Sequence, residues 1–321
     1  MKKQFLNRVF HDLVFITGMM FVFNKLHNRY ASKKNLLKAS PENYFDWDGE
    51  KIYFNCVGSG EPILLLHALH PAASSIEWLS VLDLLSKNHR VYVLDLPGCG
   101  RSSKSRAQYT GFYYIKFIQE FMHKMALHDL PVVASNLTSA ITVMASIYDP
   151  TLFSKIVVIS PPSLSSLNET PDLLSKAKML ILSAPVLGTF IYKLLCSKSE
   201  IDLAFTEKYF YNPFHDNDDL VDMYFESSQI GEGKGHYFTG RLLGKYLNIN
   251  ISHVLSGLSV PLKLIEGAET QNADQVINEW SALNPSIETA TVEQTRQLPH
   301  LEEPEKTSEE ILSFIDTVPF S

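Results

Sequence analysis

The sequence predicts an α/β protein with a mostly parallel, doubly wound sheet and an inserted block of helices. Short apolar runs typical of buried strands, such as ILLL (63–66) and VVAS (132–135), alternate with segments whose apolar residues follow helical spacing. Between residues 161 and 259, by contrast, helix-like segments follow one another with no convincing strand. The 321 residues, 45% of them hydrophobic, are enough for one large domain with a sizeable core.

An N-terminal segment, residues 1–34, precedes this domain. Its apolar run, Leu13 to Phe23, would form a helix of about 16 Å, well short of a ~30 Å bilayer core. Extending the run backwards brings in His11 and Asp12, which are costly in lipid. The basic flanks suit a helix on an anionic membrane. We therefore expect membrane attachment through this segment, with the body in the cytoplasm. Docking on the protein's own surface and a cleaved signal sequence are the alternatives.

The elements of the body follow in order from about residue 44. A hairpin with its turn at DGE opens the domain, and three strand-and-helix repeats and a fourth buried strand follow it. After the helical block, the sheet resumes with two more strands and a last helix. The corresponding segments are FDWDGEKIYFNCVG, EPILLLHALH, VLDLLSKNHR, RVYVLDLPGCGRSSKS, YYIKFIQEFMHKMALHDL, LPVVAS, SKIVVISPP, VPLKLIEGAE, SIETATVEQT and PEKTSEEILSFIDTV.

Charge and cysteine content exclude several classes of protein. The formal net charge is −7, and no Lys/Arg-rich run occurs in the body, so we expect no nucleic-acid partner. Three widely spaced cysteines, Cys56, Cys99 and Cys196, indicate neither a disulfide framework nor a zinc site. No metal and no cofactor are expected.

Four segments, in order and sensibly spaced, resemble the lidded α/β-hydrolases. They are LLLHALHPAASSIEW, VYVLDLPGCGRSSKS, VPLKLIEGAET and RQLPHLEEPEK. The resemblance runs from about residue 44 to the end of the chain. It implies a hydrolase core of residues 44–160 and 260–321, with residues 161–259 as a helical lid.

The family's nucleophile is a serine at a tight strand-to-helix turn, G-x-S-x-G. Here that turn corresponds to VVASNLTSAI (132–141), which contains no glycine. Counting along the strand places Thr138 at the nucleophile position, and counting back along the helix places Asn136 there. We favour Thr138, because strand length in a packed sheet is the stiffer constraint. Asn136 remains the alternative, since asparagine tolerates positive φ.

The other two triad positions are also substituted in this alignment. Gln297 stands where the family has its histidine, and glutamine cannot accept and return a proton at neutral pH. His300, three residues further on, is a possible substitute base. The position of the acid corresponds to Thr270, with Glu269 beside it as the alternative.

The oxyanion loop is partly retained. His67 and Ala68 occupy the family's His-Gly positions, and the N–H of Leu69 is positioned to point into the pocket. Ser139, which follows Thr138, would supply the second N–H. We interpret His67 as structural, holding the loop through hydrogen bonds.

Two functional hypotheses follow. The favoured one is a pseudoenzyme, non-catalytic or strongly impaired, whose lidded pocket binds a small apolar or acyl-type ligand or a protein partner. The alternative is an active hydrolase of carboxylic esters or amides, with Thr138 or Ser139 as nucleophile and His300 as base.

Overall fold

The computed structural model describes residues 2–31, 35–37, 43–213 and 218–317. Its centre is an eight-stranded sheet of order β1-β2-β4-β3-β5-β6-β7-β8. The pairs β1–β2 and β2–β4 are antiparallel, and all the other neighbouring strands are parallel. The strands are β1 Asn43–Trp47, β2 Glu50–Val57, β3 Glu61–Leu66, β4 His89–Leu94, β5 Leu130–Ser135, β6 Phe153–Ile159, β7 Leu262–Gly267 and β8 Glu288–Val292.

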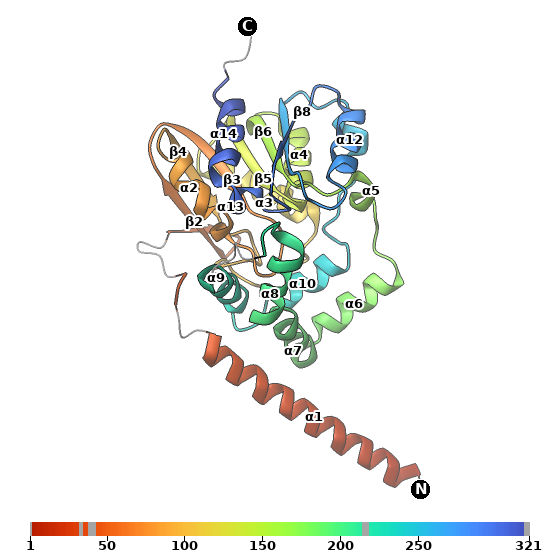
Figure 1. Ribbon diagram of the computed structural model, residues 1–321. Helices are drawn as coiled ribbons and strands as arrows, with labels where there is room; N and C mark the ends of the chain where they lie inside the picture. The colour runs from red at the N-terminus through yellow and green to blue at the C-terminus, as the bar shows by residue number, and fades with distance from the viewer. Residues whose placement is uncertain (1, 32–34, 38–42, 214–217, 318–321) are drawn as a thin grey trace.

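Helices cover both faces of this sheet, which confirms the predicted architecture (Figure 1). One apolar cluster joins one face to α3, α4 and α12, and a second joins the opposite face to α2 and α14. The helices of the core are η1 Ser75–Trp78, α2 Leu79–Leu85, α3 Gly111–Lys124, α4 Leu137–Tyr148, α12 Ala273–Leu283, α13 Pro299–Glu302 and α14 Pro304–Ile315.

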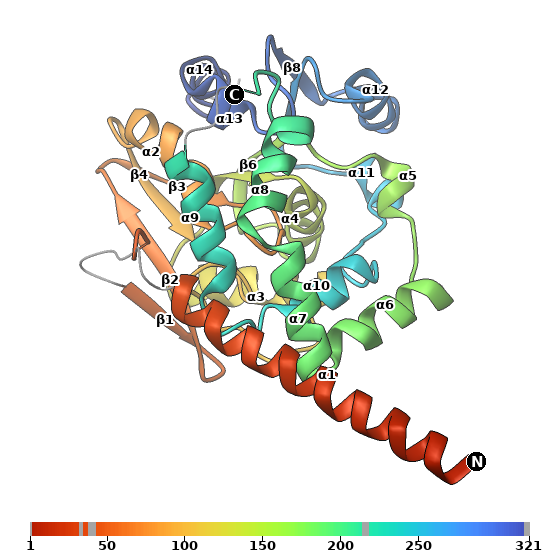
Figure 2. The same cartoon turned by 60° about the horizontal axis from the view of Figure 1, so that its bottom comes forward.

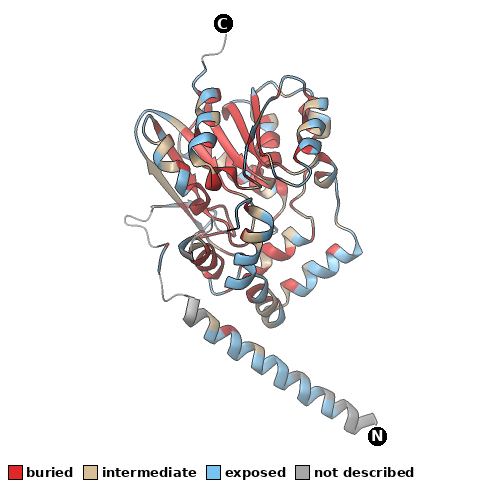
Figure 3. Cartoon of the chain, viewed as in Figure 1, coloured by how far each residue is buried: buried red, intermediate tan, exposed pale blue. Residues whose placement is uncertain are grey.

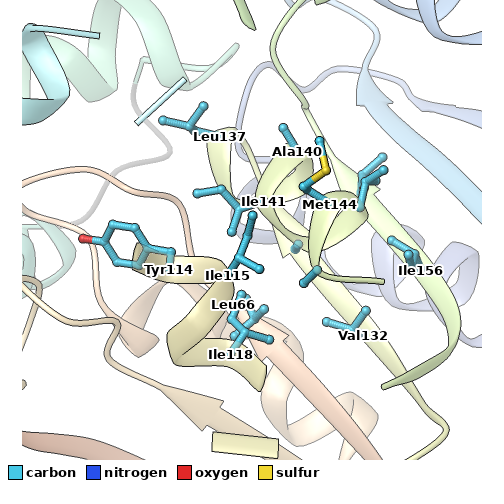
Figure 4. Packing of buried hydrophobic residues seen from close by; sticks show 14 of the residues in the cluster. Leu66, Tyr114, Ile115, Ile118, Val132, Leu137, Ala140, Ile141, Met144 and Ile156 are labelled. Atoms are coloured by element: carbon cyan, nitrogen blue, oxygen red, sulfur yellow. The ribbon is translucent and has the colours of Figure 1, made fainter. Parts of the chain in front are cut away.

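The larger cluster forms where α3 and α4 pack on β3, β5 and β6 (Figure 4). Leu66, Val132 and Ile141 are fully buried there. Each such side chain contributes about 1.5–3 kcal/mol through removal from water. This packing fixes the end of β5 and the start of α4, the elements on either side of the turn discussed below.

The segment between β6 and β7 is helical and packs below the sheet in the view of Figure 1. It coincides with the region in which the sequence shows no strand pattern. Its elements are α5 Leu164–Leu167, α6 Leu173–Ser183, α7 Pro185–Leu195, α8 Lys198–Ala204, the π-helical turn η2 Phe205–Tyr209, α9 Asp218–Gln229, α10 His236–Leu243 and α11 Ser252–Leu255. We refer to this segment as the lid.

The N-terminal segment forms one long helix, α1 Lys2–Ala31, that meets the body only near its C-terminal end (Figure 2). Phe23 packs edge-on against Phe190 of α7, and His27 packs against Phe225 of α9. Asn24 donates a hydrogen bond to the carbonyl of Val186 (3.3 Å). Within the described residues, no single helix is long and apolar enough to cross a membrane; α6 and α7 meet that criterion only jointly, with a bend of 102° between them.

A buried ion pair holds the glycine-rich loop after β4 against η1. Arg101 Nε donates to Asp95 Oδ2 (2.8 Å), and the backbone N–H and hydroxyl of Ser75 both donate to Asp95 Oδ1 (2.8 and 2.6 Å). Gly100 has a φ of +51°, and a Cβ there would lie 2.4 Å from the Asp95 carboxylate, so no other residue fits. The loop thereby fixes η1, which carries Glu77 and Trp78 toward the candidate site.

Candidate functional site

The strand-to-helix turn has its tip at Asn136. Strand β5 ends at Ser135, whose last strand partner is Ile159 of β6, and α4 begins at Leu137. Asn136 alone between them adopts a positive φ (φ 49°, ψ −128°). The preference for Thr138 at this tip is therefore corrected in favour of Asn136. The reason is that the strand stops where its pairing with β6 stops, two residues earlier than that preference requires.

The hydroxyls near the turn point into the protein rather than toward a substrate. Thr138 is 1% exposed, and its Oγ1 donates to the carbonyl of His67 (2.7 Å). Ser139 is fully buried, and its Oγ donates to the carbonyl of Ala134 (3.1 Å). Each hydroxyl therefore donates its hydrogen bond to a backbone carbonyl, and we interpret Thr138 and Ser139 as structural.

The side chain of Asn136 folds back on the turn. Its Oδ1 accepts a hydrogen bond from the N–H of Leu137 at 2.8 Å, and its Nδ2 faces the carbonyl of Ser160 at 3.4 Å. In α/β-hydrolases the N–H that follows the nucleophile is one of the two oxyanion donors. Here that N–H is already bonded to a side-chain oxygen of the same turn.

The predicted triad positions come together around one cavity of about 250 Å³, which Asn136, Thr270 and Gln297 all line. The alternative acid, Glu269, is exposed on the loop after β7, and its N–H bonds to the carbonyl of Thr295. These three positions thus lie on one cavity, and their side chains are two amides and a hydroxyl. None of the three can accept and return a proton at neutral pH.

A carboxyl group that sequence analysis missed lies in the same cavity. Glu266, near the end of β7, is 1% exposed and lines the cavity with Ser160 and Thr270. Burial raises the pKa of Glu266 to about 7, although the nearby hydroxyls of Ser160 and Thr270 act in the opposite direction. Neither carboxylate oxygen has a hydrogen bond of normal geometry among the described residues. The signal in the sequence was a glutamate inside an otherwise buried strand, since carboxylates are seldom fully buried without a partner.

A second cavity, of about 200 Å³, lies between the core and the lid. The core contributes Asn136, Gln297 and the loop residues Ala68 and Leu69. Because Asn136 and Gln297 line both cavities, these two residues separate the cavity under the lid from the cavity of Glu266. The remaining lining is mostly apolar or aromatic, with two charged groups: His70, Ala73, Glu77, Lys208, Tyr209, Tyr224, Leu242 and Leu298.

His67 holds the loop at the floor of this second cavity. It is fully buried, its Nε2 accepts from the N–H of Leu96 (2.9 Å), and its Nδ1 lies 2.7 Å from the carbonyl of Ala68. With Nε2 as acceptor, the proton is on Nδ1 and the ring is neutral, in keeping with burial, which lowers the pKa of His67. This geometry supports the structural interpretation of His67.

His300 packs beneath the site as part of a buried pair with Glu77. Its ring stacks on Trp78 with centroids 4.7 Å apart, and its Nε2 lies 3.4 Å from Glu77 Oε1. Burial alone would raise the pKa of Glu77. The contact with His300 outweighs burial, so the pKa of Glu77 lies below its usual value. The N–H of Ala68 donates to the same carboxylate. His300 thus contacts a carboxylate rather than a hydroxyl.

Comparison with known proteins agrees with this architecture. A family model described as alpha/beta hydrolase fold matches residues 61–184. An (E)-2-((N-methylformamido)methylene)succinate hydrolase from Acinetobacter baylyi is 27% identical over 103 residues, which are 32% of this chain and 38% of that protein. The uncharacterized hydrolase YugF from Bacillus subtilis (strain 168) is 25% identical over 290 residues, 86% of this chain and 98% of that protein. The chain thus spans well under half of the first relative and nearly all of the second.

Solved structures share the fold at low sequence identity. The epoxide hydrolase CorEH superposes with a TM-score of 0.71 and 16% identity, over 86% of this chain and 98% of that one. A membrane phospholipase A superposes with a TM-score of 0.67 and 18% identity, over 98% of both chains. Together with the sheet order and the family model, these matches show that the chain has the α/β-hydrolase fold.

Proposed function

We propose that this protein is a non-catalytic, or strongly impaired, relative of the ester and amide hydrolases. The observation that carries the proposal is the turn at Asn136. Its tip holds an amide in place of a nucleophile, and the amide oxygen takes the N–H of Leu137, an expected oxyanion donor. Gln297, at the position of the histidine, removes the general base. The losses agree with one another, because a base has no use without a nucleophile.

This proposal predicts that the purified chain does not turn over a short-chain p-nitrophenyl ester above the rate of a denatured sample. Thr138→Ala and Ser139→Ala are expected to leave that background unchanged, because both hydroxyls already donate to backbone carbonyls. Ester hydrolysis would be followed by absorbance across pH 6 to 9. A measurable rate that either substitution abolishes would establish the alternative, an active hydrolase with a Thr138 or Ser139 nucleophile.

We further propose that the cavity under the lid holds a small acyl-type ligand. Its volume of about 200 Å³ and its leucine and tyrosine lining suit a short apolar chain, and Lys208 of η2 supplies a cation for a carboxylate head group. The other charged group, Glu77, is buried, accepts from the N–H of Ala68 and lies 3.4 Å from His300. Burial lowers the pKa of His70 to about 4, so this histidine is neutral and adds no charge.

Two neighbouring leucines of α10 provide a matched test of this ligand site. Leu242 lines the cavity, whereas Leu243 is 42% exposed outside it. Titration calorimetry with octanoate is expected to detect binding to the unaltered chain. Leu242→Phe should weaken that binding at least tenfold by filling the cavity, and Leu243→Phe should leave it unchanged. Equal affinities for the two variants would exclude this cavity as the binding site.

We also propose that α1 attaches the protein to a membrane. Its apolar side chains, including Phe10, Phe15 and Met19, are 58–69% exposed. The membrane phospholipase A matches this chain over 98% of its length, a span that includes most of α1. Because a bilayer removes such side chains from water, it would stabilise a helix that the body leaves largely uncovered.

A further inference from the structure

The lid presents an apolar surface of its own next to α1. Helices α6 and α7 each carry large apolar side chains that are exposed. Figure 3 colours most of α6 as exposed. The most exposed are Leu173 (85%) and Leu180 (69%). The others are 39–63% exposed, and they are Leu174, Ile181, Leu187, Leu194 and Leu195. Soluble proteins seldom leave so many large apolar side chains uncovered in one region. This exposure therefore indicates a binding surface.

These two lid helices and α1 lie on the same side of the molecule. Figure 2 views that side from the front, with α1, α7 and α6 side by side. Contacts fix the arrangement: Phe23 of α1 packs on Phe190 of α7 at 5.3 Å, and Lys193 of α7 donates to the carbonyl of Asn24. Helix α6 in turn packs on α7 and α10. Helices α1, α7 and α6 therefore adjoin one another on this side of the molecule, and each carries exposed apolar side chains.

The charges of this region differ from those of the remaining chain. Helices α1, α6 and α7 contain eight Lys or Arg residues, of which Lys193 is buried, and a single acidic residue, Asp12. Without Lys193 their formal charge is +6. The whole chain carries −7. Apolar side chains interspersed with bases, in an otherwise acidic protein, match the chemistry of a bilayer that contains anionic lipid.

From the shared side, the exposure and the charge, we infer that α6 and α7 of the lid, together with α1, form one surface that lies on an anionic lipid bilayer. The inference rests on the proposed attachment through α1 and extends it, because it brings the lid itself to the membrane. The bend of 102° between α6 and α7 excludes a straight span and suits two short helices that lie along the interface. Helix α6 packs on α10, whose Leu242 lines the acyl-ligand cavity, so the proposed surface adjoins the lid side of that cavity.

The test uses the full chain with vesicles of phosphatidylcholine alone and of phosphatidylcholine mixed with phosphatidylglycerol. Flotation of wild type is expected with the mixed vesicles and at least tenfold less with the neutral ones. Leu180→Glu combined with Leu187→Glu should lower partitioning into the mixed vesicles at least tenfold although α1 is intact. Leu79→Glu is the matched control, since Leu79 is 45% exposed on α2, and it should bind as wild type does. All substituted side chains are exposed, and unchanged melting temperatures would verify folding.

Several outcomes would overturn the inference. If the lid double variant floats as wild type does while deletion of residues 1–34 abolishes flotation, then α1 alone attaches the protein and the lid does not contribute. Conversion of a dimer to a monomer by the lid variant, without a change in flotation, would assign the surface to a second copy of the chain. Equal binding to neutral and anionic vesicles would contradict the role of charge. The ester and octanoate assays are independent of all three, so failure here is distinguishable from failure of the non-catalytic proposal.

Discussion

A triple variant with Asn136→Ser, Thr270→Asp and Gln297→His is expected to hydrolyse a short-chain p-nitrophenyl ester at least about 10³-fold faster than the natural chain. The three positions line one cavity, so the new side chains enter an arrangement that the fold already provides. Asn136 already has the positive φ that a nucleophile at this turn requires. Removal of its carboxamide also frees the N–H of Leu137 to act as an oxyanion donor.

The matched control for this gain is the double variant Thr270→Asp/Gln297→His, which retains Asn136. It supplies the acid and the base without a nucleophile, and its rate should stay at background because triad members act as a unit. Esterase rates and melting temperatures of both variants would be measured together. A triple variant that folds normally and remains inactive would mean that the turn and the oxyanion loop no longer form a catalytic scaffold.

The second large effect is on stability. Glu266→Gln is expected to raise the free energy of unfolding by about 3 kcal/mol above pH 8, where wild type must bury an ionised carboxylate. The pKa of Glu266 is raised by burial from 4.5 to about 7 in the folded chain. A group with a raised folded pKa contributes stability that is fully present below its unfolded pKa and is lost as the pH rises through the folded pKa. The effect of the substitution should therefore grow between about pH 4.5 and pH 7 and be much smaller at pH 5.

Glu269→Gln is the control for this prediction, because Glu269 is an exposed carboxylate three residues further along the chain, on the loop that follows β7. Urea unfolding of wild type and of both variants at pH 5, 6, 7 and 8 would give the difference in unfolding free energy at each pH. A difference for Glu266→Gln that does not change with pH would show that this carboxyl keeps an ordinary pKa.

The sequence predicted the sheet, its order of alternating strands and helices, and the helical segment that interrupts it. These features depend on the local periodicity of apolar residues, which can be recognised in a single sequence. The four motif segments also located the regions that form the site. Gln297, Thr270 and Asn136, the alternative to the favoured Thr138, line one cavity.

The register of the turn could not be predicted, because the end of β5 is set by its pairing with β6 rather than by its own residues. Glu266 was missed for a related reason, since a single carboxylate in an apolar strand gives no local sign of what surrounds it. The position of Glu77 against His300 depends on contacts between residues more than two hundred positions apart. Such tertiary contacts leave no periodic pattern in the sequence.

The measurement that tests the non-catalytic proposal most directly is the intact mass of the wild-type chain after incubation with excess fluorophosphonate. This reagent forms a covalent adduct only with an activated nucleophile. The amide at Asn136 and the missing base at Gln297 predict that wild type keeps its mass, whereas the triple variant gains one adduct at residue 136. One adduct per wild-type chain, mapped to Thr138, to Ser139 or to any residue that lines the cavity under the lid, would contradict the proposal.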